Sequence, residues 1–123
     1  MILVDTSVWV DHLRVGDDGL IRLLQDRGVL GHPFVLGELS MGTLRHRDLL
    51  LYDLARLPQA EVASDPEVRH FIEEGRLYGR GIGYVDAHLL ASIRLTPAAV
   101  LWTRDQRLHT VADEMKLAAT WSK

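Results

Sequence analysis

The chain begins with Ile2-Leu3-Val4-Asp5, a short apolar run that ends at a carboxylate. An apolar run this brief and uniform predicts a strand over residues 2–5 that is buried on both faces. Strands of this kind belong to parallel sheets that helices cover on each side. Ligands bind such sheets at the carboxyl ends of the strands, where Asp5 lies. The opening residues therefore predict an α/β protein whose site lies beside Asp5.

The rest of the chain alternates short apolar runs with amphipathic segments of helical period, which favours a mostly parallel sheet. Thr6 or Ser7 can cap a first helix that runs to about residue 13. We predict further strands at residues 29–31, 61–63, 98–102 and 117–121. The helices that bear on the site are one opened by His32-Pro33 that contains Glu38, one that begins at the capping box Ser64-Asp65-Pro66-Glu67, one that contains Asp86, and one from Asp105 to Lys116.

Length and composition narrow the class of protein. A chain of 123 residues is expected to form a single domain over residues 1–123, with a core that needs no disulfide or metal support. Cysteine is absent, so disulfides and thiolate metal sites are excluded. No stretch approaches the ~18 apolar residues of a membrane span, and the N-terminus has no signal-peptide pattern. We therefore expect a cytoplasmic protein.

The charge pattern bears on nucleic-acid binding. A net charge of −3 argues against a simple nucleic-acid binder. All but Lys116 and Lys123 of the 14 basic residues are Arg, which suits bidentate contacts to phosphate, although a GC-rich genome would give the same bias. Clustered carboxylates would also lower the net charge, and bound cations would offset part of it.

Four acidic residues lie at the edges of predicted core elements. Asp5 ends the first strand, and Glu38 lies within the largely apolar residues 34–39. Asp86 shares a helical stripe with apolar residues, and Asp105 follows the apolar run at 98–102. Burying an unpaired carboxylate is costly, so buried acids are usually paired, protonated or bound to metal. The four acids therefore suggest one shared pocket for a hard cation such as Mg²⁺ or Mn²⁺.

An acidic pocket of this kind suits the hydrolysis of phosphodiesters. Mg²⁺ keeps several waters and takes one to three carboxylates, so the four acids would hold one ion firmly or two loosely. Bound metal makes water a usable nucleophile and stabilises charge on the phosphate. The sequence shows no Ser-His-acid, Cys-His or Lys nucleophile pattern, no Walker loop and no dinucleotide glycine signature.

Each of the acids also has an ordinary structural explanation. Asp5 could cap the helix that follows it, and Glu38 could reach solvent or pair with an arginine at position 45 or 47. Asp86 and Asp105 could be first-turn acids that a helix dipole favours. The six His residues show no metal-ligand spacing, so we interpret them as surface or interhelical residues. The three Trp residues are interpreted as core or interface residues.

The chain resembles the PIN-domain ribonucleases, and among them the VapC-type toxins of type II toxin–antitoxin systems. Each matching motif alone is weak, but the four occur in the family's order, and the resemblance runs through nearly all of the chain. No acidic position departs from the family pattern. The matching segments are Ile2-Leu3-Val4-Asp5-Thr6-Ser7-Val8-Trp9, Gly37-Glu38-Leu39, Val85-Asp86-Ala87-His88-Leu89-Leu90-Ala91, and Leu101-Trp102-Thr103-Arg104-Asp105-Gln106-Arg107-Leu108.

The resemblance implies a PIN-like, three-layer α/β/α sandwich with a central, mostly parallel sheet. It also implies a Mg²⁺-dependent endoribonuclease, in which Mn²⁺ can substitute. Asp5 and Asp86 would be the principal metal ligands, and Glu38 and Asp105 would complete the acidic pocket directly or through water. Two hydroxyl side chains match positions that orient ligands or waters: Thr6 and Thr103.

The resemblance further implies partners for the chain. They are an RNA substrate, a small VapB-like antitoxin, a second copy in a homodimer, and operator DNA reached through the antitoxin in a larger complex. The alternative hypothesis is a non-catalytic acidic α/β module, either a receiver-like phosphoacceptor or a degenerate PIN domain used for binding. A receiver should carry an acid pair after its first strand, whereas Asp5 precedes Thr6-Ser7, and a degenerate PIN domain should have lost an acid.

Overall fold

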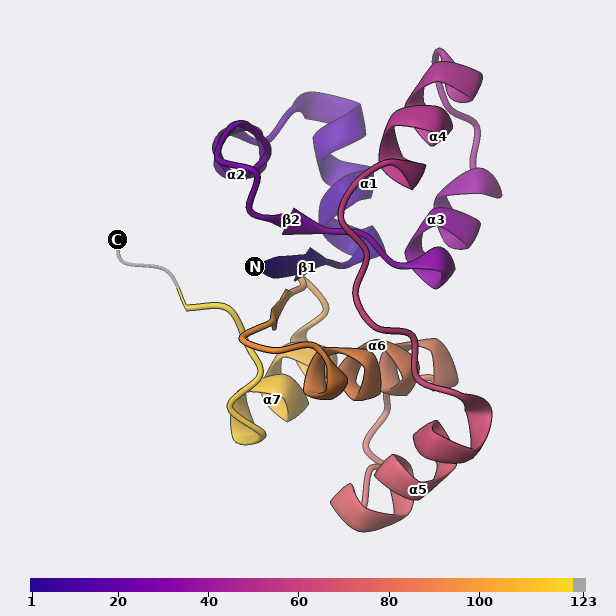
Figure 1. The fold of residues 1–123 in the computed structure, drawn as a ribbon, viewed down its shortest axis with the longest axis vertical. Helices are drawn as coiled ribbons and strands as arrows, with labels where there is room; N and C mark the ends of the chain where they lie inside the picture. The colour runs from indigo at the N-terminus through magenta and orange to yellow at the C-terminus, as the bar shows by residue number, and fades with distance from the viewer. Residues whose placement is uncertain (121–123) are drawn as a thin grey trace.

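The computed structural model describes residues 1–120, in which three short parallel strands form one sheet (Figure 1). Strand β1 (Ile2–Val4) lies between β2 (Val29–Leu30) and β3 (Val100–Trp102). Leu3 of β1 pairs with Leu30 on one side and Leu101 on the other. The carboxyl ends of the strands therefore meet at the edge where Asp5 follows β1, as the sequence predicted.

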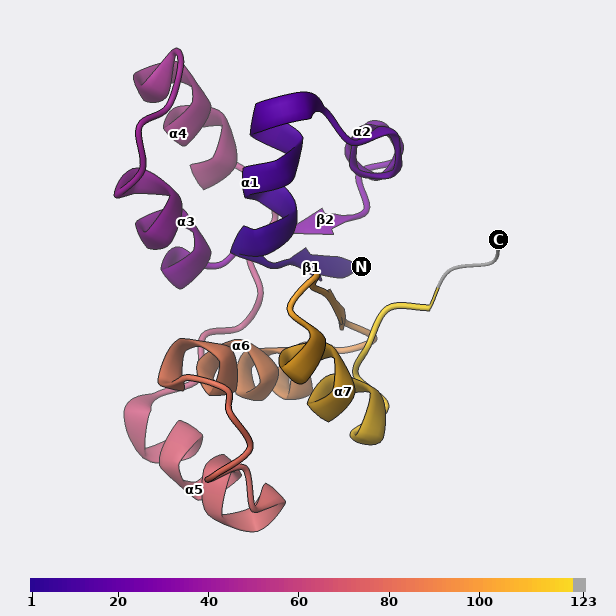
Figure 2. The same cartoon turned by 180° about the vertical axis from the view of Figure 1, so that it is seen from behind.

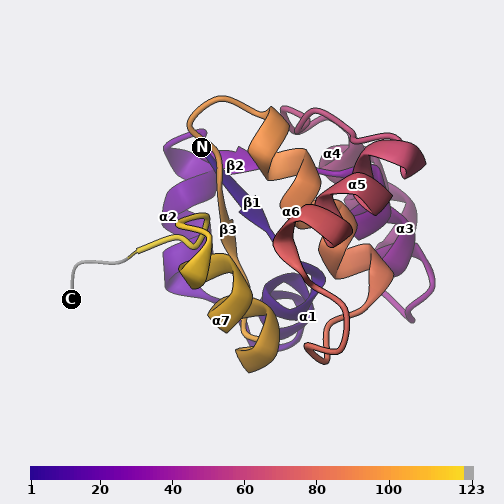
Figure 3. The ribbon, with the colours of Figure 1, turned by 90° about the horizontal axis from the view of Figure 1, so that it is seen from below.

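Helices cover both faces of this sheet, which confirms the expected α/β sandwich. In Figures 1 and 2, α1 to α4 lie on one side of the strands and α5 to α7 on the other. In Figure 3, β1 and β3 are seen between α6 and α7. The helices of the described residues are α1 (Thr6–Val15), α2 (Asp18–Gln25), α3 (Pro33–Ser40), α4 (Arg47–Ala55), α5 (Asp65–Gly75), α6 (Tyr84–Leu95) and α7 (Gln106–Glu114).

Helix α6 forms the centre of one layer and carries Asp86 in its first turn. Its residues 87–93 are all buried, which is the pattern of a helix enclosed on every side rather than along one stripe. It packs against α5 on one side and against β3 on the other. The first turn of α6 is therefore fixed by the core beneath it. None of the helices in residues 1–120 has the length and apolar character needed to cross a membrane.

One of the predicted strands is wrong, and another is reduced to a single bridge in the described residues. Residues 61–63 are extended but unpaired with the sheet, because the N–H groups of Glu61 and Ala63 donate to hydroxyl groups of α6 and the residue after it. The nearby parallel bridge joins Gly31 to Gln59 instead. In the last segment only Ala118 pairs, with Leu101, and Trp121 lies outside the described residues.

The predicted helix starts are confirmed except the first. Helix α1 has its N-cap at Asp5 rather than at Thr6 or Ser7. The capping box of α5 is present, with Ser64 and Glu67 each accepting the other's backbone N–H. Helix α3 begins at Pro33 after His32, as the sequence predicted.

His32 is a buried link between the helices that carry Glu38 and Asp86. Its Nδ1 accepts the backbone N–H of Phe34 at 3.0 Å, so Nε2 carries the proton and donates to Ser92 Oγ of α6 at 2.9 Å. Burial, and secondarily the nearby His88, lower the pKa of His32 from 6.5 to about 4. His32 therefore stays neutral at physiological pH and holds α3 against α6. Both His residues are buried between helices, in agreement with the interhelical interpretation.

The lowered pKa of His32 predicts a loss of stability in mild acid. Between pH 6.5 and pH 4 the unfolded chain binds a proton at this position that the folded chain does not, so stability falls as pH falls through this window. The free energy of unfolding should drop between pH 7 and pH 5 by about 2 kcal/mol more in the wild type than in His32→Asn. Asn retains a capping oxygen and does not titrate. Urea unfolding at both pH values measures the difference, and equal drops would show that His32 is not the group responsible.

Candidate active site

Asp5 is held by two hydroxyl groups at the carboxyl end of the central strand. Its Oδ2 accepts a hydrogen bond from Ser7 Oγ at 2.8 Å and one from Thr103 Oγ1 at 2.7 Å. Although Asp5 is the N-cap residue of α1, its side chain makes no capping hydrogen bond. Asp5 therefore occupies the N-cap position that the sequence allowed, but its carboxylate does not cap the helix and instead joins α1 to the segment after β3.

The second oxygen of Asp5 faces outward. Among residues 1–120, the only fully buried side-chain nitrogen or oxygen without a hydrogen bond is Nδ1 of His88. Oδ1 of Asp5 has no hydrogen bond in this part of the chain, so it keeps contact with solvent although the residue as a whole is only 6% exposed. One oxygen of the carboxylate is thus fixed by the protein while the other remains available to a ligand.

Asp86 is the acid on which the charges of the other three act. Burial raises the pKa of Asp86, and the charges of Asp5, Asp105 and Glu38 raise it further, in that order. The backbone N–H of Gly83, which donates to Asp86 Oδ2 at 3.0 Å, acts in the opposite direction. Segments that are far apart in the sequence therefore place their carboxylates close enough to repel one another in a single acidic pocket.

Glu38 and Asp105 lie at the exposed side of this pocket. Glu38 Oε1 accepts a hydrogen bond from Thr6 Oγ1 at 2.6 Å and forms no ion pair with Arg45 or Arg47. Asp105 caps α7, where its Oδ1 accepts the N–H of Leu108 at 2.9 Å. The ordinary explanation of Asp105 as a helix-start acid therefore holds, at the N-cap rather than in the first turn, and does not remove it from the pocket.

The pocket is more open than the sequence predicted. The apolar neighbours of the four acids suggested that all of them would be buried, yet only Asp5 is, while Asp86 is half-buried and the other two are exposed. The physical reason is that α1, α6 and α7 all begin here, at the edge of the sheet. Helix N-termini carry partial positive charge that stabilises nearby carboxylates. Helix N-termini and solvent therefore stabilise these carboxylates, and buried cationic partners are not needed.

Ser7 is the site residue that the sequence analysis did not select. It occurs in the first motif but carries no charge, so only the structure shows that its hydroxyl bonds Asp5 and lies 3.3 Å from Thr103 Oγ1. Thr103 also accepts the backbone N–H of Asp105 at 3.1 Å. The two hydroxyls therefore form a small network that connects Asp5 to the start of α7.

The donor chemistry of the pocket fits a divalent cation. Its ligands are all carboxylate oxygens, and each acid uses one oxygen in hydrogen bonds and leaves the other without one in the described residues. Within residues 1–120 no three acidic or His side chains converge far enough to hold an ion unaided. Mg²⁺ does not require this, since it keeps several waters and is usually bound through one or two carboxylates. Burial raises the pKa of Asp86 most, and the nearby charges of Asp5, Asp105 and Glu38 raise it further, which is the electrostatic setting that a bound cation would relieve.

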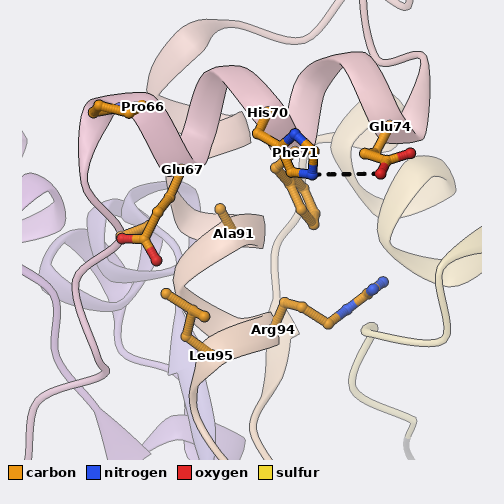
Figure 4. A pocket seen from close by; sticks show the side chains of 9 residues that line it. Pro66, Glu67, His70, Phe71, Glu74, Ala91, Arg94 and Leu95 are labelled. Carbon is orange, nitrogen blue, oxygen red and sulfur yellow. Dashed lines mark ion pairs between the residues drawn. The ribbon is translucent and has the colours of Figure 1, made fainter.

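A separate cleft of about 590 Å³ lies between α5 and α6 (Figure 4). Phe71 and Leu95 form part of its apolar lining, with the His70–Glu74 ion pair at one side. The α6 residues that line it belong to the C-terminal half of the helix, whereas Asp86 lies in the first turn. This cleft is therefore not part of the acidic pocket.

Neutralising Asp86 should relieve repulsion in the pocket. We expect Asp86→Asn to be as stable as the wild type or more stable at pH 7 in EDTA, with a gain below about 1 kcal/mol because solvent screens this half-buried group. A raised folded pKa costs stability above that pKa, and the cost disappears below the unfolded value of 3.8, so the gain should vanish near pH 3. Urea unfolding measures both, with Asp53→Asn on the exposed face of α4 as the control.

The same variant tests the cation. Mg²⁺ should raise the melting temperature of the wild type more than that of Asp86→Asn, because a ligand that binds only the folded state stabilises it more as its affinity rises. An Asp86→Asn protein that unfolds, or one that responds to Mg²⁺ as the wild type does, would show that Asp86 has a structural role instead.

Known proteins resemble this chain over almost its whole length. Residues 2–114 match the family described as PIN domain. Two relatives, each named Ribonuclease VapC32, come from Mycobacterium tuberculosis strains CDC 1551 / Oshkosh and ATCC 25618 / H37Rv. Each is 48% identical to this chain over 118 residues, which are 96% of this chain and 95% of the relative.

Proposed function

The chain belongs to the PIN-domain family, and on that premise we propose that it is the endoribonuclease toxin of a VapC-type toxin–antitoxin pair. The observation that carries the proposal is the grouping of four carboxylates at the carboxyl edge of the sheet, where α1, α6 and α7 begin and where Asp5, Asp105 and Glu38 act on Asp86. A relative at 48% identity that is named a ribonuclease favours this over the non-catalytic acidic module. We take residues 1–123 as one domain, which the match over residues 2–114 supports.

The proposal includes a divalent cofactor. Nucleases of this family generally depend on a divalent metal, and we propose Mg²⁺, with Mn²⁺ as a substitute, because the donors are hard oxygens. Asp5 and Asp86 would be the principal ligands, with Glu38 and Asp105 completing the set. When bound, the ion lowers the pKa of a water molecule and offsets the negative charge of the scissile phosphate.

The residues of the chain would keep this acidic set oriented before substrate arrives. Thr103 and Ser7 fix one oxygen of Asp5, so the carboxylate cannot turn both oxygens inward. Thr6 does the same for Glu38, and the N–H of Gly83 for Asp86. Preorganised groups of this kind cost no reorganisation during the reaction. We therefore assign Thr6 and Thr103 an orienting role, and we add Ser7 to them.

The first test is the metal dependence and chemistry of RNA cleavage. The purified protein should cleave RNA only with Mg²⁺ or Mn²⁺ and leave 5′-phosphate and 3′-hydroxyl ends, because no side-chain nucleophile competes with water. Asp5→Asn and Asp86→Asn should lower cleavage at least about 100-fold while the proteins stay folded. Undiminished cleavage in excess EDTA, or 2′,3′-cyclic phosphate ends, would refute the mechanism. No cleavage by the wild type under any metal condition would favour the non-catalytic hypothesis.

The proposal also includes partners and a location. A cytoplasmic ribonuclease harms its host unless it is inhibited, so we propose a VapB-like antitoxin, together with a homodimer and a larger complex that reaches operator DNA through the antitoxin. Large apolar side chains are exposed on α1, at the end of α3 and on α4: Val10, Met41, Leu49 and Tyr52. Helix α3, which carries Glu38, contacts both of the other helices. An amphipathic segment laid across these helices would cover them and end near the acidic pocket.

The antitoxin should inhibit by placing a cation in the acidic pocket. An Arg fork can satisfy two carboxylates at once, and Lys is the less suitable choice. Replacing that basic residue with Ala should restore RNA cleavage and leave much of the binding intact, because the apolar contacts remain. Leu49→Asp in this chain should weaken the complex without changing cleavage by the free toxin. The control Val62→Asp, before α5, should change neither antitoxin binding nor RNA cleavage. A partner that leaves the pocket open and active would contradict this prediction.

A further inference from the structure

We infer that Arg104 is a positioning residue of the acidic pocket, held with Asp11 and Asp17 in a three-residue ion-pair cluster that fixes residues 103–105 against α1 and α2. We call Arg104, Asp11 and Asp17 the Arg104 clamp. The inference rests on the proposed function, because it concerns the residues that orient Asp5 and Asp105.

The guanidinium of Arg104 contacts both acids of the clamp. Nη1 donates to Asp11 Oδ2 at 2.6 Å, and Nη2 donates to Asp17 Oδ2. The same group lies over the ring of Trp102, with 5.8 Å between Cζ and the ring centroid. Isolated surface ion pairs contribute little, but an Arg that bridges two carboxylates in a network is the arrangement that does contribute. The pKa of Arg104 is raised, first of all by its hydrogen bond to Asp11.

Asp17 is itself firmly placed, so it can act as an anchor. Its backbone N–H donates to Nδ1 of His12 at 3.0 Å, and its Oδ1 caps α2 by accepting the N–H of Leu20 at 2.9 Å. Its Oδ2 is the oxygen that takes Arg104, so both carboxylate oxygens are used. Partial burial acts to raise the pKa of Asp17, but the Leu20 N–H and Arg104 outweigh it and the pKa is lowered. The clamp is thus tied to the corner between α1 and α2.

The backbone on either side of Arg104 carries this constraint into the site. The Arg104 N–H donates to Ser7 Oγ at 3.0 Å, and Ser7 in turn donates to Asp5. The preceding residue, Thr103, donates directly to Asp5, and the N–H of the following residue, Asp105, donates to Thr103. Residues 103–105 therefore touch Asp5 by two routes. If the clamp is released, these hydrogen bonds lose the ion pairs that tie the segment to the corner between α1 and α2, and both routes should loosen.

A direct contact between Arg104 and RNA is the competing explanation, and the geometry disfavours it. Both terminal nitrogens of the guanidinium already bond carboxylates, which neutralise its charge. Binding a phosphate would require Arg104 to leave two short ion pairs and expose two acids to the RNA. Arg104 therefore acts through Ser7, Thr103 and Asp105 rather than on the substrate.

A double-mutant comparison separates these explanations. The variants are Arg104→Ala, Arg104→Lys, the Asp11→Asn/Asp17→Asn pair, and the combination of Arg104→Ala with that pair. Asp17→Asn keeps a capping oxygen for α2, so this pair tests the clamp even where Arg104→Ala folds poorly. The matched control is Arg14→Ala, which removes the other arginine beside Asp11, an exposed pair with N···O of 3.6 Å.

We expect Arg104→Ala and the Asp pair to lower kcat/KM for RNA by the same factor, about 10- to 100-fold, and mainly through kcat. The combined variant should lose no more kcat/KM than either variant alone, because the effects of substitutions within one network are not additive. Arg104→Lys should recover part of the activity, and Arg14→Ala should stay within about twofold of the wild type. If Arg104→Ala instead raises KM alone while the Asp pair has no effect, Arg104 binds RNA and the inference is wrong.

Amide hydrogen exchange provides a readout that does not need RNA cleavage. In Arg104→Ala and in the Asp pair, the amides of residues 104 and 105 should exchange at least about tenfold faster than in the wild type, because their acceptors are Ser7 and Thr103. Unchanged exchange at these amides would overturn the inference. A wild type that cleaves no RNA would refute the proposed function, yet the exchange measurement would still decide whether the clamp positions the site.

Discussion

The hydrogen bonds to Asp5 Oδ2 are the interaction on which the site depends. They join Asp5 to Thr103, which lies 98 positions away beyond β3, and to Ser7, which lies two positions away in the first turn of α1. Because β1 is the central strand, the carboxylate that follows it is surrounded by the ends of both neighbouring strands. Holding Asp5 therefore also holds the start of α7, where Asp105 lies.

The second constraint is repulsion among the acids. Four carboxylates in one pocket favour protonation or a bound cation, and the raised pKa of Asp86 records that tension. The fold does not remove the repulsion by burial with partners, because Glu38 and Asp105 are exposed. Instead, helix N-termini, hydroxyl donors and the Gly83 N–H offset the repulsion among the carboxylates. In the described part of the chain, the acids therefore stay close together without being neutralised by cationic partners.

Much of this architecture could be predicted from the sequence, because its signals are local. The apolar run at residues 2–4 and the capping box at Ser64 depend on neighbouring residues alone, and both are confirmed. The acids could be grouped because strand ends and helix starts have sequence signatures. Residues 61–63 failed for the opposite reason: their composition suits a strand, but hydroxyls of Ser92 and Thr96 take their N–H groups. That competition depends on tertiary contacts which no local pattern reports.

The Arg104 clamp shows the same limit for the site. From the sequence, Arg104 is one basic residue among 14, next to a candidate ligand, and nothing local distinguishes it from the other arginines that could contact phosphate. Its partners, Asp11 of α1 and Asp17 at the start of α2, lie 93 and 87 positions away in the chain. Their ion pairs with Arg104 argue against a contact between Arg104 and phosphate. These ion pairs also affect the charge that the site presents to RNA. With Arg104 neutralised, the pocket itself presents its acids to an approaching RNA, whose phosphates they repel. Under the proposed function, RNA and the divalent cation would therefore bind with positive coupling, each raising the affinity for the other, because the cation reverses the charge that the phosphate meets.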